Sequence, residues 1–152
     1  LMINSLRQPV VFSGLAADQA ALLEEEPAPQ FDHALKVRLE QLVHQEKPHL
    51  HPNLTLEQLS RKLDAPSREV SRAINQGFGC NFFEFVSRYR IDEAKSRLAD
   101  AANQKNILQI MYESGFNSKS VFNTAFKKET GFTPSEYRRR ALQGDIRPEP
   151  QS

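Results

Sequence analysis

The side chains best suited to chemistry are basic, amide and hydroxyl groups, and they are concentrated between Ser114 and Arg140. This segment, SGFNSKSVFNTAFKKETGFTPSEYRRR, interleaves Lys and Arg with four Phe and ends in three consecutive arginines. Cationic side chains neutralise phosphate groups, while amide and hydroxyl groups can bond to the edges of bases. The composition therefore suits a surface that binds a polyanion, although an ordinary solvated helix face has the same composition.

Other chemistries have little support in the sequence. It contains no Gly-rich phosphate loop, HExxH metal site, nucleophile motif or paired carboxylates, so we expect no catalytic residues, no cofactor and no enzyme. His44, His49 and His51 lie close together, but Pro48 interrupts them and a fourth ligand is missing, so we predict no metal site. The single cysteine, Cys80, excludes an intramolecular disulfide, and we expect a buried thiol in a reducing compartment.

Charge is distributed unevenly along the chain. The 152 residues carry a formal net charge of +1 and are 39% hydrophobic, which suits one ordinary domain or two very small ones. Residues 1–60 hold four Lys/Arg against eight Asp/Glu, whereas residues 61–140 hold fifteen against nine. This asymmetry favours an anion-binding surface in the second part of the chain.

The elements that must position these side chains are helices. Residues 1–30 end in the acidic, proline-containing EEEPAPQ, and we interpret them as a linker or juxtaposed segment that is partly disordered. Leucines at helical spacing predict an additional helix within residues 31–50. Residues 51–143 are predicted to form the main domain, and residues 144–152 a flexible tail. No apolar run approaches the roughly 20 residues that a membrane span requires.

The main domain contains one unit twice. Each copy has a short helix, a tight turn and a second helix with a three-residue apolar seam, and a further capped helix follows. An offset of 52 residues aligns Gly79 with Gly131 and Asn81 with Thr133. The seam residues align at the same offset, as do the glutamates that complete the caps: Val70 with Phe122, Ala73 with Ala125, Ile74 with Phe126, and Glu84 with Glu136.

This repeated pattern is typical of a helix-turn-helix, whose second helix enters the major groove of DNA. The connecting helix, from Asn81 to about Ala99, would be roughly 28 Å long, close to the roughly 34 Å pitch of B-DNA. We predict an all-α fold of two helix-turn-helix subdomains joined by a long connecting helix and preceded by a linker and one additional helix. The outward positions of the two second helices are Arg68, Ser71, Arg72 and Asn75, and Lys119, Ser120, Asn123, Thr124 and Lys127.

Residues 53–140 resemble the C-terminal DNA-binding domain of the AraC/XylS family of transcription regulators, most closely in GFNSKSVFNTAFKKETGFTPSEYRR. The chain departs from the family pattern at Asp64, where glycine is usual, and at Met111, where a small alanine is usual. The resemblance implies sequence-specific reading of two successive major grooves. It implies base contacts from Arg68, Ser71, Arg72, Lys119, Ser120, Asn123 and Thr124, and phosphate contacts from Asn75, Lys127 and Arg138.

The same resemblance implies partners and a location. Double-stranded DNA is the expected partner, with RNA polymerase as a second one if the parent protein is an activator, and no small-molecule ligand is expected within this chain. A cytoplasmic, DNA-associated location is expected. The segment LRQPVVFSG is similar to the stretch that joins a membrane-embedded sensor to this domain in some family members, so the parent protein could be anchored in a membrane.

Two alternatives stay open for the N-terminal part. The additional helix could pack on the first helix-turn-helix, or a homodimer could form through residues 31–46 or through residues missing from this chain; packing within the chain is favoured for so short an apolar stripe. The chain could also be a protein-interaction module that works through this acidic N-terminal helix, with a basic half that only keeps it soluble. That hypothesis predicts no salt-dependent affinity for DNA.

Overall fold

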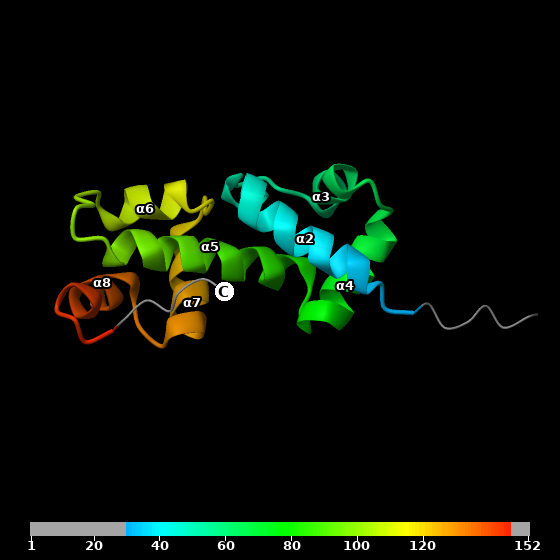
Figure 1. Cartoon of the computed structure of the whole chain (residues 1–152). Helices are drawn as coiled ribbons and strands as arrows, with labels where there is room; N and C mark the ends of the chain where they lie inside the picture. Colours follow the sequence, from blue (N-terminus) through cyan, green and yellow to red (C-terminus); the bar gives the residue numbers. More distant parts are fainter. Residues whose placement is uncertain (1–29, 147–152) are drawn as a thin grey trace, which may run out of the picture. The chain divides into compact units, whose positions relative to one another are not determined.

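Helices make up all regular structure in residues 30–146, the part of the chain that the computed structural model describes (Figure 1). The predicted all-α class is therefore confirmed, whereas most of the predicted linker and tail lies outside the described residues. No helix among those described is both long and apolar enough to cross a membrane. The elements are α2 (His33–Glu46), the 3-10 turn η1 (Pro48–Leu50), α3 (Leu56–Leu63), α4 (Ser67–Phe78), α5 (Phe82–Ala99), α6 (Ile107–Glu113), α7 (Lys119–Thr130) and α8 (Pro134–Leu142).

Local caps explain where most of these helices begin. The predicted capping boxes of Thr55 with α3, Asn81 with α5 and Thr133 with α8 are all present, because each side chain accepts from the third helical amide and the third residue reciprocates. The helix α4 differs: Pro66 occupies its N-cap and no side chain caps it, while Ser67, a residue type that often caps helices, is its first residue. A proline fixes its own φ and can end a turn without a capping side chain.

Left-handed residues end the repeated helices. Asp64 has φ 49° at the end of α3, so it takes the conformation expected of the usual glycine. Gly79 and Gly131 have φ 66° and 78° and end α4 and α7 at matching places in the two copies. Gly77 lies within α4, although glycine commonly follows a helix end.

Two separate hydrophobic cores hold the described residues together. The first contains residues of α2, α3 and α4 with the start of α5, and the second contains residues of α6, α7 and α8 with the end of α5. Phe85 and Val86 of α5 belong to the first core, while Ile91, Ala94 and Leu98 belong to the second. Among the described helices, α5 is therefore the one that contributes buried residues to both cores. The aromatic residues Phe116, Phe122, Phe126 and Tyr137 are buried in the second core, and Phe82 packs against the first.

The additional helix α2 packs within the chain. Its stripe of Leu35, Leu39 and Val43 is buried in the first core, and α2 lies against both α3 and α4. Arg38 also donates a hydrogen bond to the carbonyl of Leu63 at the end of α3. The apolar face that could have paired with a second copy is thus already covered by the first helix-turn-helix.

His49, in η1, is buried with 5% of its surface exposed, and its Nδ1 has no protein partner among the described residues. Burial lowers the pKa of His49 from its ordinary 6.5 to about 4, because an imidazolium would lose its hydration there. The unfolded chain consequently binds a proton between these pH values that the folded chain does not. Folding stability should be unaffected by this group above pH 6.5 and should fall as the pH drops towards 4.

We expect this histidine to cost up to about 3 kcal/mol of folding free energy between pH 6.5 and pH 4. Urea unfolding of the wild type and of His49→Gln at pH 7, 6 and 5 measures the effect. The variant, which has no group titrating in this range at that position, should lose less stability between pH 7 and 5. Parallel stability curves for the two proteins would contradict the assignment.

Candidate nucleic-acid interface

The predicted contact residues of the first unit lie on the outward side of α4. Val70, Ala73 and Ile74 are buried in the first core and fix the rotation of the helix about its axis. Arg68 is then exposed one turn before Arg72, which is partly buried with the rest of its side chain open to solvent. Ser71 is likewise partly buried, and Asn75 is exposed one turn further along. A rigid, anchored helix thus presents two guanidinium groups from its first half.

The second set lies on α7 in the same manner. Phe122 and Phe126, with 1% and 0% exposure, anchor the helix in the second core. The side chain of Ser118 caps α7 by accepting from the amide of Val121. All five predicted contact residues of this helix are exposed on the remaining surface: Lys119, Ser120, Asn123, Thr124 and Lys127.

The helix α5 relates the two recognition helices to each other. It packs against α4 in the first unit and against α6, α7 and α8 in the second. Figure 1 shows α4 and α7 below α5, whereas α3 and α6 lie above it. The 18 residues of α5 span about 27 Å, which is close to the roughly 34 Å separation of successive major grooves on one side of B-DNA.

A cleft of about 430 Å³ lies between the start of α5 and α7 and was not predicted from the sequence. Ser120 and Thr124 line it together with Phe83, whose side chain is 60% exposed. Two ion pairs bridge the same helices: Arg88 to Glu129 at 3.8 Å and Lys128 to Glu84 at 3.5 Å. These pairs join residues 41 and 44 positions apart, so local spacing offered no signal for them.

The predicted phosphate contacts differ in their surroundings. Asn75 and Lys127 are exposed and lie on the recognition helices themselves. Arg138 is partly buried and donates hydrogen bonds to the carbonyls of Lys105 at 2.6 Å and Asn103 at 2.5 Å. It therefore holds the loop before α6 against α8. The guanidinium of Arg140 lies 4.7 Å from the ring centre of Phe132, so the arginine run also has partners within the chain.

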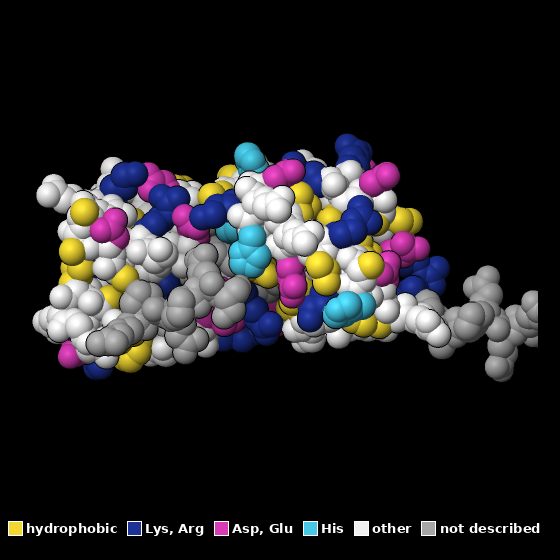
Figure 2. Space-filling model, in the orientation of Figure 1, with side chains coloured by type: hydrophobic (Ala, Val, Ile, Leu, Met, Phe, Trp, Pro, Cys, Tyr) yellow, Lys and Arg dark blue, Asp and Glu magenta, His cyan; other side chains and the backbone are white. Residues whose placement is uncertain are grey.

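The face on which α2 lies carries charges of both signs. Figure 2 shows Lys and Arg side chains interspersed there with Asp and Glu, instead of one continuous basic patch. On α2 and its surroundings the ion pairs Lys36–Glu40 and Lys62–Glu46 account for part of this mixture. The predicted contact residues of α4 and α7, by contrast, include the cations Arg68, Arg72, Lys119 and Lys127 and no carboxylate.

The cysteine and the clustered histidines, which could otherwise suggest a reactive thiol or a metal site, have structural surroundings. Cys80 is buried in the first core, as predicted, and burial raises the pKa of its thiol. Among residues 30–146 no three His, Cys, Asp or Glu side chains are grouped as a metal site would require. The backbone carbonyls of His49 and His51 accept hydrogen bonds from Arg90, which places this segment against α5.

Comparisons with known proteins agree with this arrangement. A family model described as a helix-turn-helix domain matches residues 59–140. Over 82 residues the chain is 35% identical to the HTH-type transcriptional activator RhaS of Mannheimia succiniciproducens; the match covers 54% of this chain and 30% of that protein. The chain thus spans less than a third of the length of this relative.

Solved structures share the fold. The C-terminal domain of AraT, a response regulator from Geobacillus stearothermophilus, is 26% identical with a TM-score of 0.62, and the match covers 80% of this chain and 94% of that one. A transcriptional regulator from Chromobacterium violaceum, described as containing an AraC-type DNA-binding domain, is 20% identical with a TM-score of 0.61 over 73% of this chain and 98% of its own. At that lower identity the likeness shows the fold alone. The matched family is one of transcription regulators and not of enzymes, and the chain belongs to it as an AraC-type helix-turn-helix DNA-binding domain.

Proposed function

We propose that this domain reads one duplex with α4 and α7 in two successive major grooves, as part of a bacterial transcription activator. The observation that carries the proposal is the pair of anchored helices, each with an exposed polar side, joined by one 18-residue helix of suitable length. A monomer of this kind could contact two blocks of sequence about one helical turn apart. Salt-dependent binding is expected, in contrast to a protein-interaction module.

We assign the base contacts to the outward residues of the two helices. Arg72 is the strongest candidate, because an arginine that donates two hydrogen bonds to a guanine is the commonest specific contact in the major groove. Asn123 could make the equivalent pair of bonds with adenine. Arg68, Ser71, Lys119, Ser120 and Thr124 complete the proposed base-reading set.

Phosphate contacts would orient the two helices on the duplex. Asn75 and Lys127 are exposed beside the proposed base-reading positions and are our first candidates. The start of α4, which no side chain caps, could offer backbone amides to another phosphate. Arg138 would have to release two backbone carbonyls to reach a phosphate, so we expect it to contribute less than Lys127.

An activating role is supported by the similarity to an HTH-type transcriptional activator. We propose that the parent protein acts in the cytoplasm, at a promoter, where it would also contact RNA polymerase. If it forms a homodimer, we expect the contact to lie outside the stripe of Leu35, Leu39 and Val43, because these residues are buried within the domain.

Selection from a randomised duplex library tests the proposal. The chain would be used to enrich bound sequences, and the affinity of the best sequence would then be titrated against salt. Two conserved blocks about one helical turn apart, with a steep loss of affinity as salt rises, are expected. A single block, or weak binding with no enrichment, would overturn the two-groove proposal.

A further inference from the structure

The junction between the two helix-turn-helix units is polar. The two hydrophobic cores do not merge. Arg90 lies between their contributions from α5, and Glu93 lies just beyond, two residues after Ile91; both are buried, with 8% and 9% exposure. Apolar packing connects the two units only through α5, so polar contacts at the junction provide a second connection between them. A buried charge destabilises the folded protein unless it is paired. The partners of Arg90 and Glu93 therefore indicate which segments these two side chains hold in place.

Arg90 binds the backbone that follows α2. Its Nε donates to the carbonyl of His49 at 2.7 Å, and its Nη2 donates to those of His51 at 2.7 Å and Pro52 at 3.3 Å. Planar guanidinium groups offer several donors in a fixed arrangement and can hold such a turn rigidly. The segment 47–52 is thereby fastened to the middle of α5, although it precedes the residues 59–140 that match the family model.

The second unit touches this segment directly. Gly115, in the turn before α7, has φ 92°, and a Cβ added there would collide with the His49 carbonyl and lie 2.9 Å from Nε of Arg90. The guanidinium carbon of Arg90 also lies 5.7 Å from the ring centre of Phe116, which belongs to the second core. The turn of the second helix-turn-helix is therefore seated on the segment that leads into the first.

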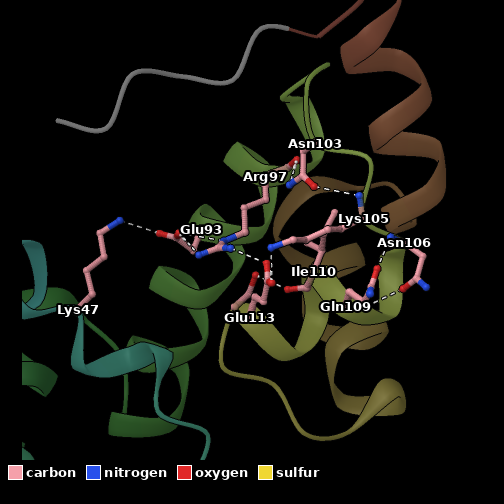
Figure 3. Close-up of polar contacts among 10 residues, drawn as sticks. Lys47, Glu93, Arg97, Asn103, Lys105, Asn106, Gln109, Ile110 and Glu113 are labelled. Carbon is pink, nitrogen blue, oxygen red and sulfur yellow. Dashed lines mark hydrogen bonds and ion pairs between the residues drawn. The ribbon is translucent and has the colours of Figure 1, made fainter.

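A chain of ion pairs spans the same junction (Figure 3). Lys47 lies 3.0 Å from one carboxylate oxygen of Glu93, and Arg97 lies 2.9 Å from the other. Arg97 continues to Glu113 of α6 at 2.7 Å, and Lys105 lies 2.5 Å from the same carboxylate. Burial alone would raise the pKa of Glu93, but the hydrogen bonds from Lys47 and Arg97 outweigh it and keep that pKa below its ordinary value.

We propose that residues 47–52, held by Arg90 and Glu93, form a brace that sets the spacing and angle between α4 and α7, and so determines which operator spacing the domain accepts. Arg90 is a positioning residue in this proposal, because it would act through the two recognition helices without touching DNA. The inference rests on the two-groove reading proposed above. If α4 and α7 are held rigidly, binding of the second helix after the first is effectively intramolecular, which raises the affinity for the full operator. This gain in affinity is lost if the angle between the two helices is no longer fixed.

The test compares the wild type with Arg90→Met and Lys47→Met on four duplexes: the selected operator, each block alone, and the operator with one base pair inserted between the blocks. One extra base pair moves the second block by about 3.4 Å and turns it by roughly 35°. Lys95→Met is the matched control, since Lys95 is a cation on the same helix whose ion pair is with Asp92 of α5. Thermal unfolding sets a temperature at which every variant is folded.

For Arg90→Met we expect about a tenfold loss on the full operator, little change on single blocks, and a smaller penalty for the inserted base pair than in the wild type. Lys47→Met should change binding in the same direction by about two- to threefold, because Lys47 is itself partly exposed and Arg97 still pairs with Glu93 when Lys47 is replaced. Lys95→Met should match the wild type on all four duplexes. If Arg90→Met does not fold, Arg90→Lys and Lys47→Met provide the same comparison.

Equal losses on single blocks and on the full operator, or an unchanged penalty for the inserted base pair, would overturn the brace. Failure of the underlying function has a different signature, which is visible without any variant. If the wild-type protein selects only one block, or if a second block does not raise its affinity, two-groove reading itself is contradicted.

Discussion

Replacement of Arg72 by alanine should weaken binding to the selected operator by about 1–3 kcal/mol, a factor of about 5–150. Affinity for random DNA should fall much less, and a second selection with Arg72→Ala should show a relaxed preference at one base position of one block. The reason is that a guanidinium placed against a base edge contributes bonds that only the correct base can return.

The structure makes this substitution easy to interpret. Arg72 lies on α4 between the buried Val70 and the buried pair Ala73 and Ile74, so the helix stays anchored when the arginine is shortened. Alanine also favours helix more than arginine does. Unfolding of Arg72→Ala should therefore resemble that of the wild type, and any loss of affinity reports the contact and not the fold.

Lys127→Ala is the matched comparison on α7. Lys127 is exposed on a helix whose rotation Phe122 and Phe126 fix. A phosphate contact carries no sequence information, so this variant should lose similar affinity on specific and random DNA and lower the salt slope by about one. Arg72 would be removed from the base-reading set if its replacement behaved in the same way as that of Lys127.

Replacement of Phe126 by alanine should lower the free energy of unfolding by about 3–5 kcal/mol. The side chain is 0% exposed and its ring centre lies 5.6 Å from that of Phe122 and 5.4 Å from that of Tyr137. Truncation would leave a cavity among aromatic rings that cannot close without moving α7 or α8. Domains of this size have only about 5–15 kcal/mol of stability, so the loss is a large share of the total.

Val121→Ala on the same helix is the control for this substitution. Val121 is 40% exposed, and its truncation should change stability by less than about 0.5 kcal/mol. Urea unfolding measures both variants. Selection with Phe126→Ala under conditions where the first core remains folded should recover the α4 block without the α7 block. A change of less than about 1 kcal/mol for Phe126→Ala would mean that the second core is not packed as described.

Local sequence determined most of the helices. A cap depends on residues within one turn, so Thr55 with Gln58, Asn81 with Glu84 and Thr133 with Glu136 could be recognised without knowledge of the fold. The 52-residue repeat then placed the two apolar seams, which the structure buries in two cores. The exception among these helix starts is α4, which follows Pro66 and begins at Ser67 without a side-chain cap.

The outward polar residues of α4 and α7 could also be predicted, because burial of one side of a helix exposes the other. The sequence could not predict how Arg138 is used. Its carbonyl partners lie 33 and 35 positions away, in a loop whose path depends on the packing of α8 against α5. Two of the three arginines at the end of α8, Arg138 and Arg140, thus have partners within the chain.

The sequence by itself determined which elements the domain contains. These are an all-helical chain, two helix-turn-helix units, the apolar seams of those units and the outward hydrogen-bond donors on their second helices. The tertiary structure alone decided how the units are held together. Arg90 and Glu93 interrupt the apolar side of α5, and their partners at His49 and Lys47 are 41 and 46 positions distant. Helical periodicity reports which side of one helix is buried, but long-range hydrogen bonds form only after separate elements have packed together.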